Sequence, residues 1–353
     1  MKSTIKKKDL LALLKKFLLT HAPGGQEEEM DEAVKPELET LCDETWTDDF
    51  GNVVGFVKGG NDAPMAVTAH KDEVAMICKR IEDDGRLRVE NIGGAYPWKY
   101  GEGPVQILAR EKIIDGVLSV GCAHTSGETA SMAKARSAPL SWEALRIDAK
   151  MKKEDLQKAG VGPGSRVVIH RCRKEPFYLG ECVCGWALDD KGAVAILLTA
   201  LKEFRNRGLK PNCDIYFAAT AVEEGGAPAG AYLGREHKIG TIIALEIGPA
   251  EKEYDTSNCE KPIVLYRDSG HLYDKDLADE FCDIAGEMGF GAQPATVTSF
   301  GSEASYAKKY GQVARAGCIG FPTQNSHGFE MSNIKGMLNV ARLLAEYLVR
   351  HST

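Results

Sequence analysis

The stretch LDDKGAVAILLTALKEFRNRGLKPNCDIYFAATAVEE (residues 188–224) decides the fold class. Apolar residues recur in its first half at helical spacing, at positions 193, 196, 197, 200, 201 and 204. This period predicts a helix from about 190 to 206. The second half, residues 213–224, is a mostly apolar run that predicts a buried strand ending in Glu223 and Glu224. A helix that leads into a buried strand is typical of an α/β protein.

Strands and helices alternate on both sides of this stretch. The runs MAVTAH (65–70), TIIALEIG (241–248) and RAGCIGF (315–321) predict further buried strands. A turn at 49–52 between alternating apolar residues predicts a hairpin. Helical spacing or composition predicts helices at 9–20, 26–42, 274–289 and 334–348. We therefore expect an α/β domain with a mostly parallel central sheet that helices cover on both faces.

Between about 76 and 174, the pattern of apolar residues changes to shorter runs. Short strand-like pieces follow one another there, separated by glycine, proline and charged pairs: MICKRI, LRVENI, VQILAR, GVLSVG and RVVIHR. Several short strands at close spacing are typical of a small barrel or sandwich. We predict that residues 1–75 and 175–353 form one catalytic domain, and that residues 76–174 are an inserted small β-barrel domain.

Composition narrows the class of protein. The chain has 353 residues, 43% of them hydrophobic and 27% charged, as in globular proteins of more than one domain. A net charge of −7 gives no electrostatic reason to bind nucleic acid or anionic lipid. Lys15 and Lys16 interrupt the N-terminal apolar run, and no other run approaches the roughly 20 residues of a membrane span. Ten scattered cysteines without a CxxC pair predict a reducing compartment, hence the cytoplasm.

Three of the predicted strands end in ionisable residues. These are His70, the pair Glu223–Glu224, and Glu246. In open α/β sheets, ligands bind beyond the carboxyl ends of the strands. Charges at buried strand ends are costly unless they are paired or bind metal, so we expect one shared site.

Two further residues complete a set of metal ligands. Asp189 lies just before the predicted helix, and His327 follows the last strand. Two histidines and three carboxylates suit zinc, cobalt or manganese. Two ions about 3.5–4 Å apart need a carboxylate that reaches both, and we assign this role to Asp189. We expect one ion on His70 and Glu246, and the other on Glu224 and His327.

Two neighbours of these ligands are assigned to catalysis. Glu223 lies beside a ligand and is suited to be the general base on a water that bridges the two metals. Asp72 is two residues from His70 and can accept the other ring N–H, which fixes the tautomer.

The chain resembles peptidase family forty-two, the tetrahedral and deblocking aminopeptidases, which include glutamyl aminopeptidase. The order and spacing of six motifs carry this resemblance: HKDE (70–73), LDDKGAV (188–194), VEEGG (222–226), LEIGP (245–249), GSEAS (301–305) and NSHGFE (325–330). The resemblance implies a zinc-peptidase-like fold and a two-metal aminopeptidase whose ligands and base are the residues assigned above. It also implies peptide substrates and a β-rich insertion that helps subunits assemble, commonly into hollow dodecamers.

The chain departs from the family pattern at three positions. Glu246 and Glu303 stand where the family usually has Asp, and Val222 stands where it has Gln. In related two-metal peptidases, Glu at the position of Glu246 is also associated with carboxypeptidase or deacylase activity. A metal-dependent carboxypeptidase or deacylase is therefore the alternative function.

Three other interpretations are weaker. A glycoside hydrolase using Glu223 and Glu224 is disfavoured, because neighbouring residues on a strand face opposite sides. An assembly protein without catalysis is disfavoured by the complete ligand set. Taken singly, the acidic pair Asp189–Asp190 is as well explained by a helix cap. Other histidines, His21 among them, are predicted at the surface or in loops.

Overall fold

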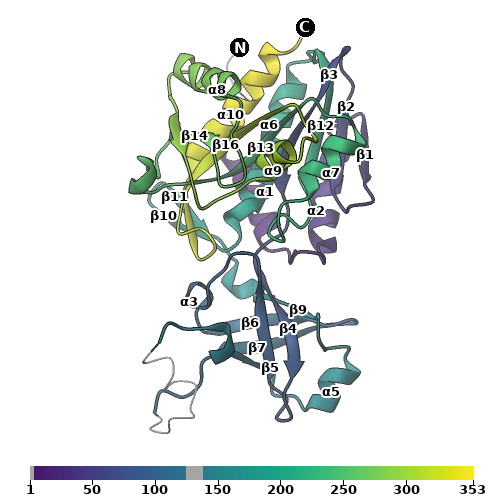
Figure 1. Cartoon of the computed structure of the whole chain (residues 1–353), viewed down its shortest axis with the longest axis vertical. Coiled ribbons are helices and arrows are strands. Elements are labelled where there is room, and N and C mark those ends of the chain that lie inside the picture. Colours follow the sequence, from purple (N-terminus) through teal and green to yellow (C-terminus); the bar gives the residue numbers. More distant parts are fainter. Residues whose placement is uncertain (1–3, 125–137) are drawn as a thin grey trace.

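The computed structural model describes residues 4–124 and 138–353. Residues 125–137 of the predicted insertion and residues 1–3 lie outside this description. The chain forms two parts, a sheet covered by helices and a smaller barrel, which are joined where the chain crosses between them (Figure 1). The helix α1, near the start of the chain, and the C-terminus lie on the sheet part, far from the barrel (Figure 1).

The larger part is built on an 11-stranded sheet whose centre is parallel. Nine strands follow the order β1-β2-β12-β3-β13-β16-β17-β11-β10, and β14 pairs with β15 and with β16. The neighbours β12, β3, β13 and β16 are parallel, whereas β1–β2 and the strands beyond β16 are antiparallel. The predicted parallel centre is confirmed, and so is the hairpin. The strands are β1 Glu44–Thr47, β2 Val53–Val57, β3 Asp62–His70, β10 Phe177–Leu179, β11 Cys182–Gly185, β12 Cys213–Thr220, β13 Thr241–Pro249, β14 Ile263–Arg267, β15 Gln293–Thr296, β16 Arg315–Gln324 and β17 Glu330–Asn333.

Helices cover both faces of this sheet, as predicted. On one face, α1, α2, α6, α8 and α10 share the main apolar core with the sheet. On the other face, α7 and α9 pack over β13, β3 and β16, where Ala304 and Ala307 meet Ala244 and Cys318. The helices are α1 Lys7–Leu18, α2 Glu28–Glu39, α6 Leu188–Asn206, α7 Ala229–Glu236, α8 Lys275–Glu287, α9 Glu303–Lys309 and α10 Ile334–Arg350.

The smaller part is a closed six-stranded barrel with its own apolar core. The predicted insertion supplies its strands, in the order β4-β5-β8-β7-β6-β9. The three-residue strand β8 has no apolar run long enough to predict it. The elements are β4 Ala75–Ile81, β5 Leu87–Ile92, α3 Pro97–Tyr100, β6 Gly103–Leu108, β7 Ile113–Ser119, β8 Arg146–Asp148, α5 Lys153–Lys158 and β9 Arg166–Ile169.

One predicted boundary is wrong in a way that affects the site. The strand β12 ends at Thr220, although we predicted it to continue to Glu224. Val222 has a φ of 57°, in the left-handed region, and turns the chain out of the sheet direction. Glu223 and Glu224 therefore lie in a turn, so the strand alternation that placed them on opposite faces does not apply.

Within the described residues, no helix is long and apolar enough to cross a membrane. All ten cysteines lie in the described part of the chain, and the nine other than Cys122 are free thiols.

Candidate metal centre

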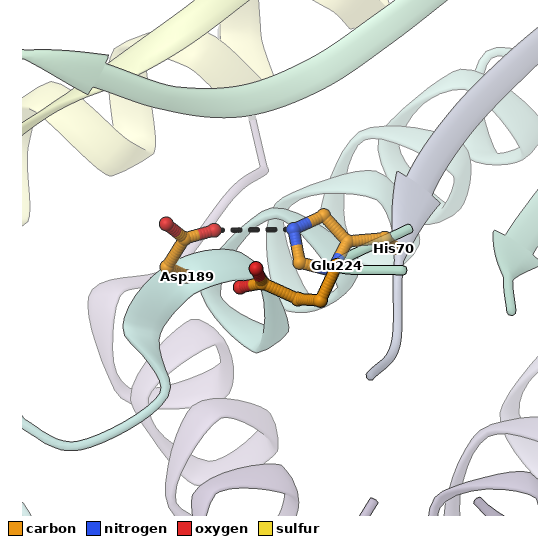
Figure 2. A group of neighbouring side chains, drawn as sticks. All are labelled: His70, Asp189 and Glu224. Carbon is orange, nitrogen blue, oxygen red and sulfur yellow. Dashed lines mark hydrogen bonds and ion pairs between the residues drawn. The ribbon is translucent and has the colours of Figure 1, made fainter. Parts of the chain in front are cut away.

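The five predicted ligands reach one place from five segments of the chain. His70 is the last residue of β3, Glu246 lies on β13, and Asp189 lies at the start of α6. Glu224 and His327 lie in the segments that follow β12 and β16. Figure 2 shows His70, Asp189 and Glu224 pointing toward one another. The site thus lies beyond the carboxyl ends of the parallel strands, where α/β sheets bind ligands.

Asp189 lies between the two histidines. Its Oδ1 is 3.1 Å from Nε2 of His70, and its Oδ2 is 3.4 Å from Nε2 of His327. Oε1 of Glu224 is 3.5 Å from the same nitrogen of His327. The two oxygens of one carboxylate therefore face two separate sets of donor atoms.

Two groups of candidate ligands occur among the described residues. In each, ligand atoms lie within 4.8 Å of one another: His70 with Asp189 and Glu224, and His70 with Asp190 and Glu246. From the sequence alone, Asp190 has no predicted role beyond that of a helix cap. Its position next to Asp189 was the signal available, but only the fold shows that its carboxylate reaches Glu246.

Asp72 lies against the imidazole of His70 and also binds the backbone of two residues in the turn after β12. Its Oδ1 is 3.3 Å from Nδ1 of His70, and its carbonyl oxygen is 3.2 Å from the same nitrogen. The same carboxylate accepts the backbone N–H of Glu223 at 2.9 Å and that of Glu224 at 3.1 Å. Asp72 therefore ties the end of β3 to the turn after β12.

Glu330, which was not among the predicted site residues, makes similar contacts to the segments of Asp189 and His327. Its Oε2 accepts the backbone N–H of Asp189 at 3.0 Å, and its Oε1 accepts that of His327 at 3.1 Å. Asp190 likewise accepts the backbone N–H of His70 at 3.2 Å. These carboxylates bind backbone groups of the neighbouring ligand segments and hold them in register.

The carboxylates of the site are buried and incompletely satisfied. Oδ1 of Asp190 and Oε1 of Glu224 accept no hydrogen bond from any described residue. Burial, with the nearby charge of Asp189, raises the pKa of Glu224 to about 7 despite His327. Burial alone would lower the pKa of His327, but Glu224 and Asp189 outweigh it and raise that pKa to about 10. Divalent cations would neutralise these charges and satisfy the free oxygens, so the donor set fits them.

Glu223 lies at the edge of this ligand set. Its side chain is 11% exposed, and its Oε2 is 3.8 Å from Nε2 of His70. Burial raises the pKa of Glu223 well above its usual value, against the effect of His70. A carboxylate with a raised pKa beside a polar centre is the kind of group that serves as a general base.

Glu303, the second departure from the family pattern, lies nearby and is also buried. Its Oε1 accepts the hydroxyl of Thr220 at 2.9 Å, and its Oε2 accepts no hydrogen bond from the described residues. Burial raises the pKa of Glu303 to about 7.

A cavity of about 790 Å³ opens onto these residues. One wall comes from the barrel side, where Gly94, Tyr96 and Lys99 follow β5. Gly93 has a φ of 82°, and a Cβ there would lie 2.6 Å from Oε2 of Glu224. The opposite wall includes residues that follow β13 and residues that precede α9, among them Glu251, Tyr254, Ser299 and Phe300. The cavity is thus large enough for a small ligand and lies between the two parts of the chain.

A model of the family of M42 glutamyl aminopeptidases matches residues 51–343. Similar solved structures include an aminopeptidase from the archaeon Desulfurococcus kamchatkensis, with a TM-score of 0.87 and 24% identity, covering 98% of this chain and 96% of that one. A TET aminopeptidase from a marine sediment Thaumarchaeota archaeon has a TM-score of 0.89 and 20% identity, with 97% and 96% covered. The TET1 peptidase of Pyrococcus horikoshii, which can assemble into a tetrahedron or a large octahedral shell, has a TM-score of 0.83 and 23% identity, with 96% and 99% covered. At these identities, the structures establish that the fold is shared.

Proposed function

This chain belongs to the M42 glutamyl aminopeptidase family and is an aminopeptidase. We propose that it uses two divalent metal ions, with Glu223 as the general base, to release N-terminal residues from peptides. One observation carries the metal proposal. The two oxygens of Asp189 face two histidines, at 3.1 Å from His70 and 3.4 Å from His327, which is the arrangement a shared carboxylate needs.

In this proposal the ligands divide into two sets around Asp189. His70 and Glu246 would hold one ion, and Glu224 and His327 would hold the other. Zinc suits these ligands best, and cobalt or manganese are compatible with them. When bound, the ions would polarise the scissile carbonyl and make a water molecule more acidic.

The chain's own residues then move the proton and hold the geometry. Glu223 accepts a proton from the attacking water and delivers it to the leaving amine. Asp72 keeps Glu223 in place, because it accepts the backbone N–H of Glu223 and faces His70 at the same time. A substrate bound in the 790 Å³ cavity would displace water and strengthen these interactions.

The turn after β12 also bears on the glycoside hydrolase alternative. Glu223 and Glu224 both face the site, so the argument from strand alternation is lost. Each, however, lies next to a histidine rather than across an open cleft from the other, which favours metal ligation over the attack on a sugar from two sides.

The neighbouring residues Glu223 and Glu224 make a matched pair for the test. We expect Glu223→Gln to bind two metal ions per chain and to lose at least about a thousandfold in kcat on aminoacyl anilides. We expect Glu224→Gln to lose one of the ions. Metal content by elemental analysis and kcat are measured on both variants and on the wild type.

N-acetylated and C-terminal substrates complete the test, because they separate an aminopeptidase from a deacylase or carboxypeptidase. We expect turnover only with a free N-terminal amine. Full activity of Glu223→Gln would refute the assignment of the base, and cleavage of N-acylated substrates alone would favour the alternative prompted by Glu246.

We also propose that residues 76–174 form an oligomerisation domain and that the chain self-associates, for example into a dodecamer. The barrel part exposes large apolar side chains: Tyr96, Trp98, Ile113 and Val117. Exposed apolar groups of this kind favour protein contacts. Light scattering of the wild type and of Trp98→Ser tests this, and a monomer at all concentrations would refute it. The nine free thiols other than Cys122 support our proposal of a cytoplasmic location, which fractionation of the source cells tests.

A further inference from the structure

Two lysines, Lys174 and Lys191, are fully buried beside Glu73, although lysine is rarely buried without a charged partner. Lys174 and Lys191 are both 0% exposed, and both approach Glu73, which is 3% exposed. Nζ of Lys174 donates to both oxygens of Glu73, at 2.6 Å each. Nζ of Lys191 lies 3.3 Å from Oε1 of Glu73. We call Glu73, Lys174, Lys191 and His21 the ion cluster.

Two members of the ion cluster, Glu73 and Lys174, lie where the chain passes between the sheet and the barrel. Glu73 follows the end of β3 and precedes β4, which opens the barrel. Lys174 follows β9, which closes the barrel, and precedes β10. The ion pair Glu73–Lys174 therefore links the segment by which the chain enters the barrel to the segment by which it leaves the barrel.

His21 extends the ion cluster into the barrel. It lies in the loop after α1, in line with the prediction of a surface or loop residue, but it is buried, at 1% exposed. Burial and the charge of Lys174 lower the pKa of His21 to about 4, so the ring is neutral. Its Nδ1 lies 3.1 Å from Nζ of Lys174, which can only donate. Nε2 must then carry the proton and donate to Oε1 of Gln106 on β6, at 2.7 Å.

The ion cluster also touches the loop that carries the metal ligands. Glu73 is held at its backbone, where its N–H donates to the carbonyl of Ala22 at 2.9 Å, and at its side chain, which accepts the N–H of Ala22 at 2.9 Å. The residue before it is Asp72. Because Asp72 binds His70 and the N–H groups of Glu223 and Glu224, a shift of Glu73 is passed directly to the site.

We propose that Lys174 is a positioning residue of the metal centre: by holding Glu73 it fixes Asp72, so that the seating of the barrel on the sheet sets the geometry of His70, Glu223 and Glu224. This rests on the proposed function, since the geometry that Lys174 sets is that of the metal site. Lys191 and the carbonyl of Thr20, which accepts from both lysines at 3.1 and 3.0 Å, keep the two ammonium groups in place.

The chain offers a matched control for this proposal. Arg171 lies three residues before Lys174 and also ties the returning chain to the sheet part, through Glu29 at 2.7 and 2.8 Å and through the carbonyl of Leu19 at 2.8 Å. This pair is partly exposed and makes no contact with Glu73. Loss of Arg171 therefore weakens the docking of the same segment without releasing the loop that contains Asp72.

The experiment compares Lys174→Met with Arg171→Met in the full-length protein. Three quantities are measured: kcat and KM on an aminoacyl anilide, the visible absorption of the cobalt-loaded protein, and amide hydrogen exchange of residues 222–226 in the metal-free protein. For Lys174→Met we expect kcat to fall about 10- to 100-fold with KM within about threefold, an altered cobalt spectrum, and faster exchange at 222–226. For Arg171→Met we expect all three to stay within about twofold of the wild type.

Each outcome decides the proposal. A Lys174→Met protein with the wild-type kcat, spectrum and exchange overturns it, and so does an Arg171→Met protein that loses as much. If Lys174→Met does not fold, Glu73→Gln is compared in its place, since the amide still accepts from Ala22 but loses the charge; wild-type values for that variant overturn the proposal. If the wild type binds no metal, the proposed function fails, and the exchange of residues 222–226 still decides the role of Lys174.

Discussion

The loop from His70 to Glu73 contributes to two buried sets of charged side chains that differ in how their charges are satisfied. In the ion cluster, two lysines surround one carboxylate, and hydrogen bonds from protein groups complete the set. In the metal centre, carboxylates outnumber histidines, and oxygens of Asp190 and Glu224 have no hydrogen-bond donor among the described residues. The pKa of Glu73 is held at about 2, because the lysines outweigh the effect of burial, whereas that of Glu224 rises to about 7.

This contrast separates a structural cluster from a binding site. A buried charge that is paired and hydrogen-bonded within the chain needs nothing more. A buried carboxylate that lacks a partner is costly, and a cation repays that cost when it binds. Removing a carboxylate charge is therefore expected to lower the free energy of unfolding in the ion cluster and to leave it unchanged or raise it in the metal-free metal centre.

The largest expected effect is that of metal removal. Chelation should abolish peptidase activity, by more than about a thousandfold, and zinc or cobalt should restore it. Binding to the folded state alone should also raise the free energy of unfolding, by about 4 kcal/mol for one ion at a thousandfold excess over its dissociation constant. Calorimetry with and without metal measures this. If the chelator changes neither the activity nor the unfolding temperature, the proposal of a metal centre is wrong.

The second effect compares one carboxylate from each cluster in the metal-free protein. Glu73→Gln should lower the free energy of unfolding by about 3–5 kcal/mol, because it leaves buried lysines unpaired. Glu224→Gln should leave that free energy unchanged or raise it, since above pH 7 the wild type holds an ionised carboxylate against a raised pKa. Urea unfolding at pH 8 measures both. Equal losses in the two variants would remove the distinction between the clusters.

Sequence reasoning found the ligand segments because their pattern is local. An apolar run that ends in an ionisable residue is visible in MAVTAH and in TIIALE, and it gave His70 and Glu246. The barrel was likewise predictable, because its strands are separate apolar runs. The residues around the ligands were not, since their partners are distant in sequence: Glu330 binds the N–H of Asp189, 141 positions away.

The ion cluster was hidden for a related reason. In the sequence, Lys174 and Lys191 look like ordinary surface charges, and only the closure of the barrel brings Lys174 to Glu73, 101 positions away. The end of β12 was misplaced because Ala221 and Val222 continue its apolar run, although Val222 is in the left-handed region. Apolar composition alone does not reveal that turn.

The third effect is a pH dependence within the ion cluster. The pKa of His21 is about 4 in the folded protein, whereas an unperturbed histidine, as in the unfolded chain, has a pKa of 6.5. As pH falls, the unfolded chain therefore takes up the proton first. Stability should therefore fall between pH 6.5 and pH 4, by up to about 3 kcal/mol. His21→Gln should remove this part of the slope while keeping a hydrogen-bonding side chain. Urea midpoints of unfolding, measured for both proteins across this pH range, test the prediction. If the midpoints of the two proteins change with pH in parallel, His21 is not a neutral buried group.

The smallest effect concerns Glu246, where the metal centre departs from its family. Glu246→Asp withdraws the carboxylate by one methylene from a group in which His70, Asp190 and Glu246 lie within 4.8 Å. If Glu246 is the ligand, the affinity for one ion should fall about tenfold, or about 1.4 kcal/mol, with KM little changed. Glu303→Asp is the control: it should keep both ions and lose about 1 kcal/mol of stability with its hydrogen bond to Thr220. Titration of both variants with metal decides between them. Unchanged affinity in Glu246→Asp, together with weakened binding in Asp190→Asn, would transfer the role of ligand to Asp190, the carboxylate whose free Oδ1 already lacks a partner.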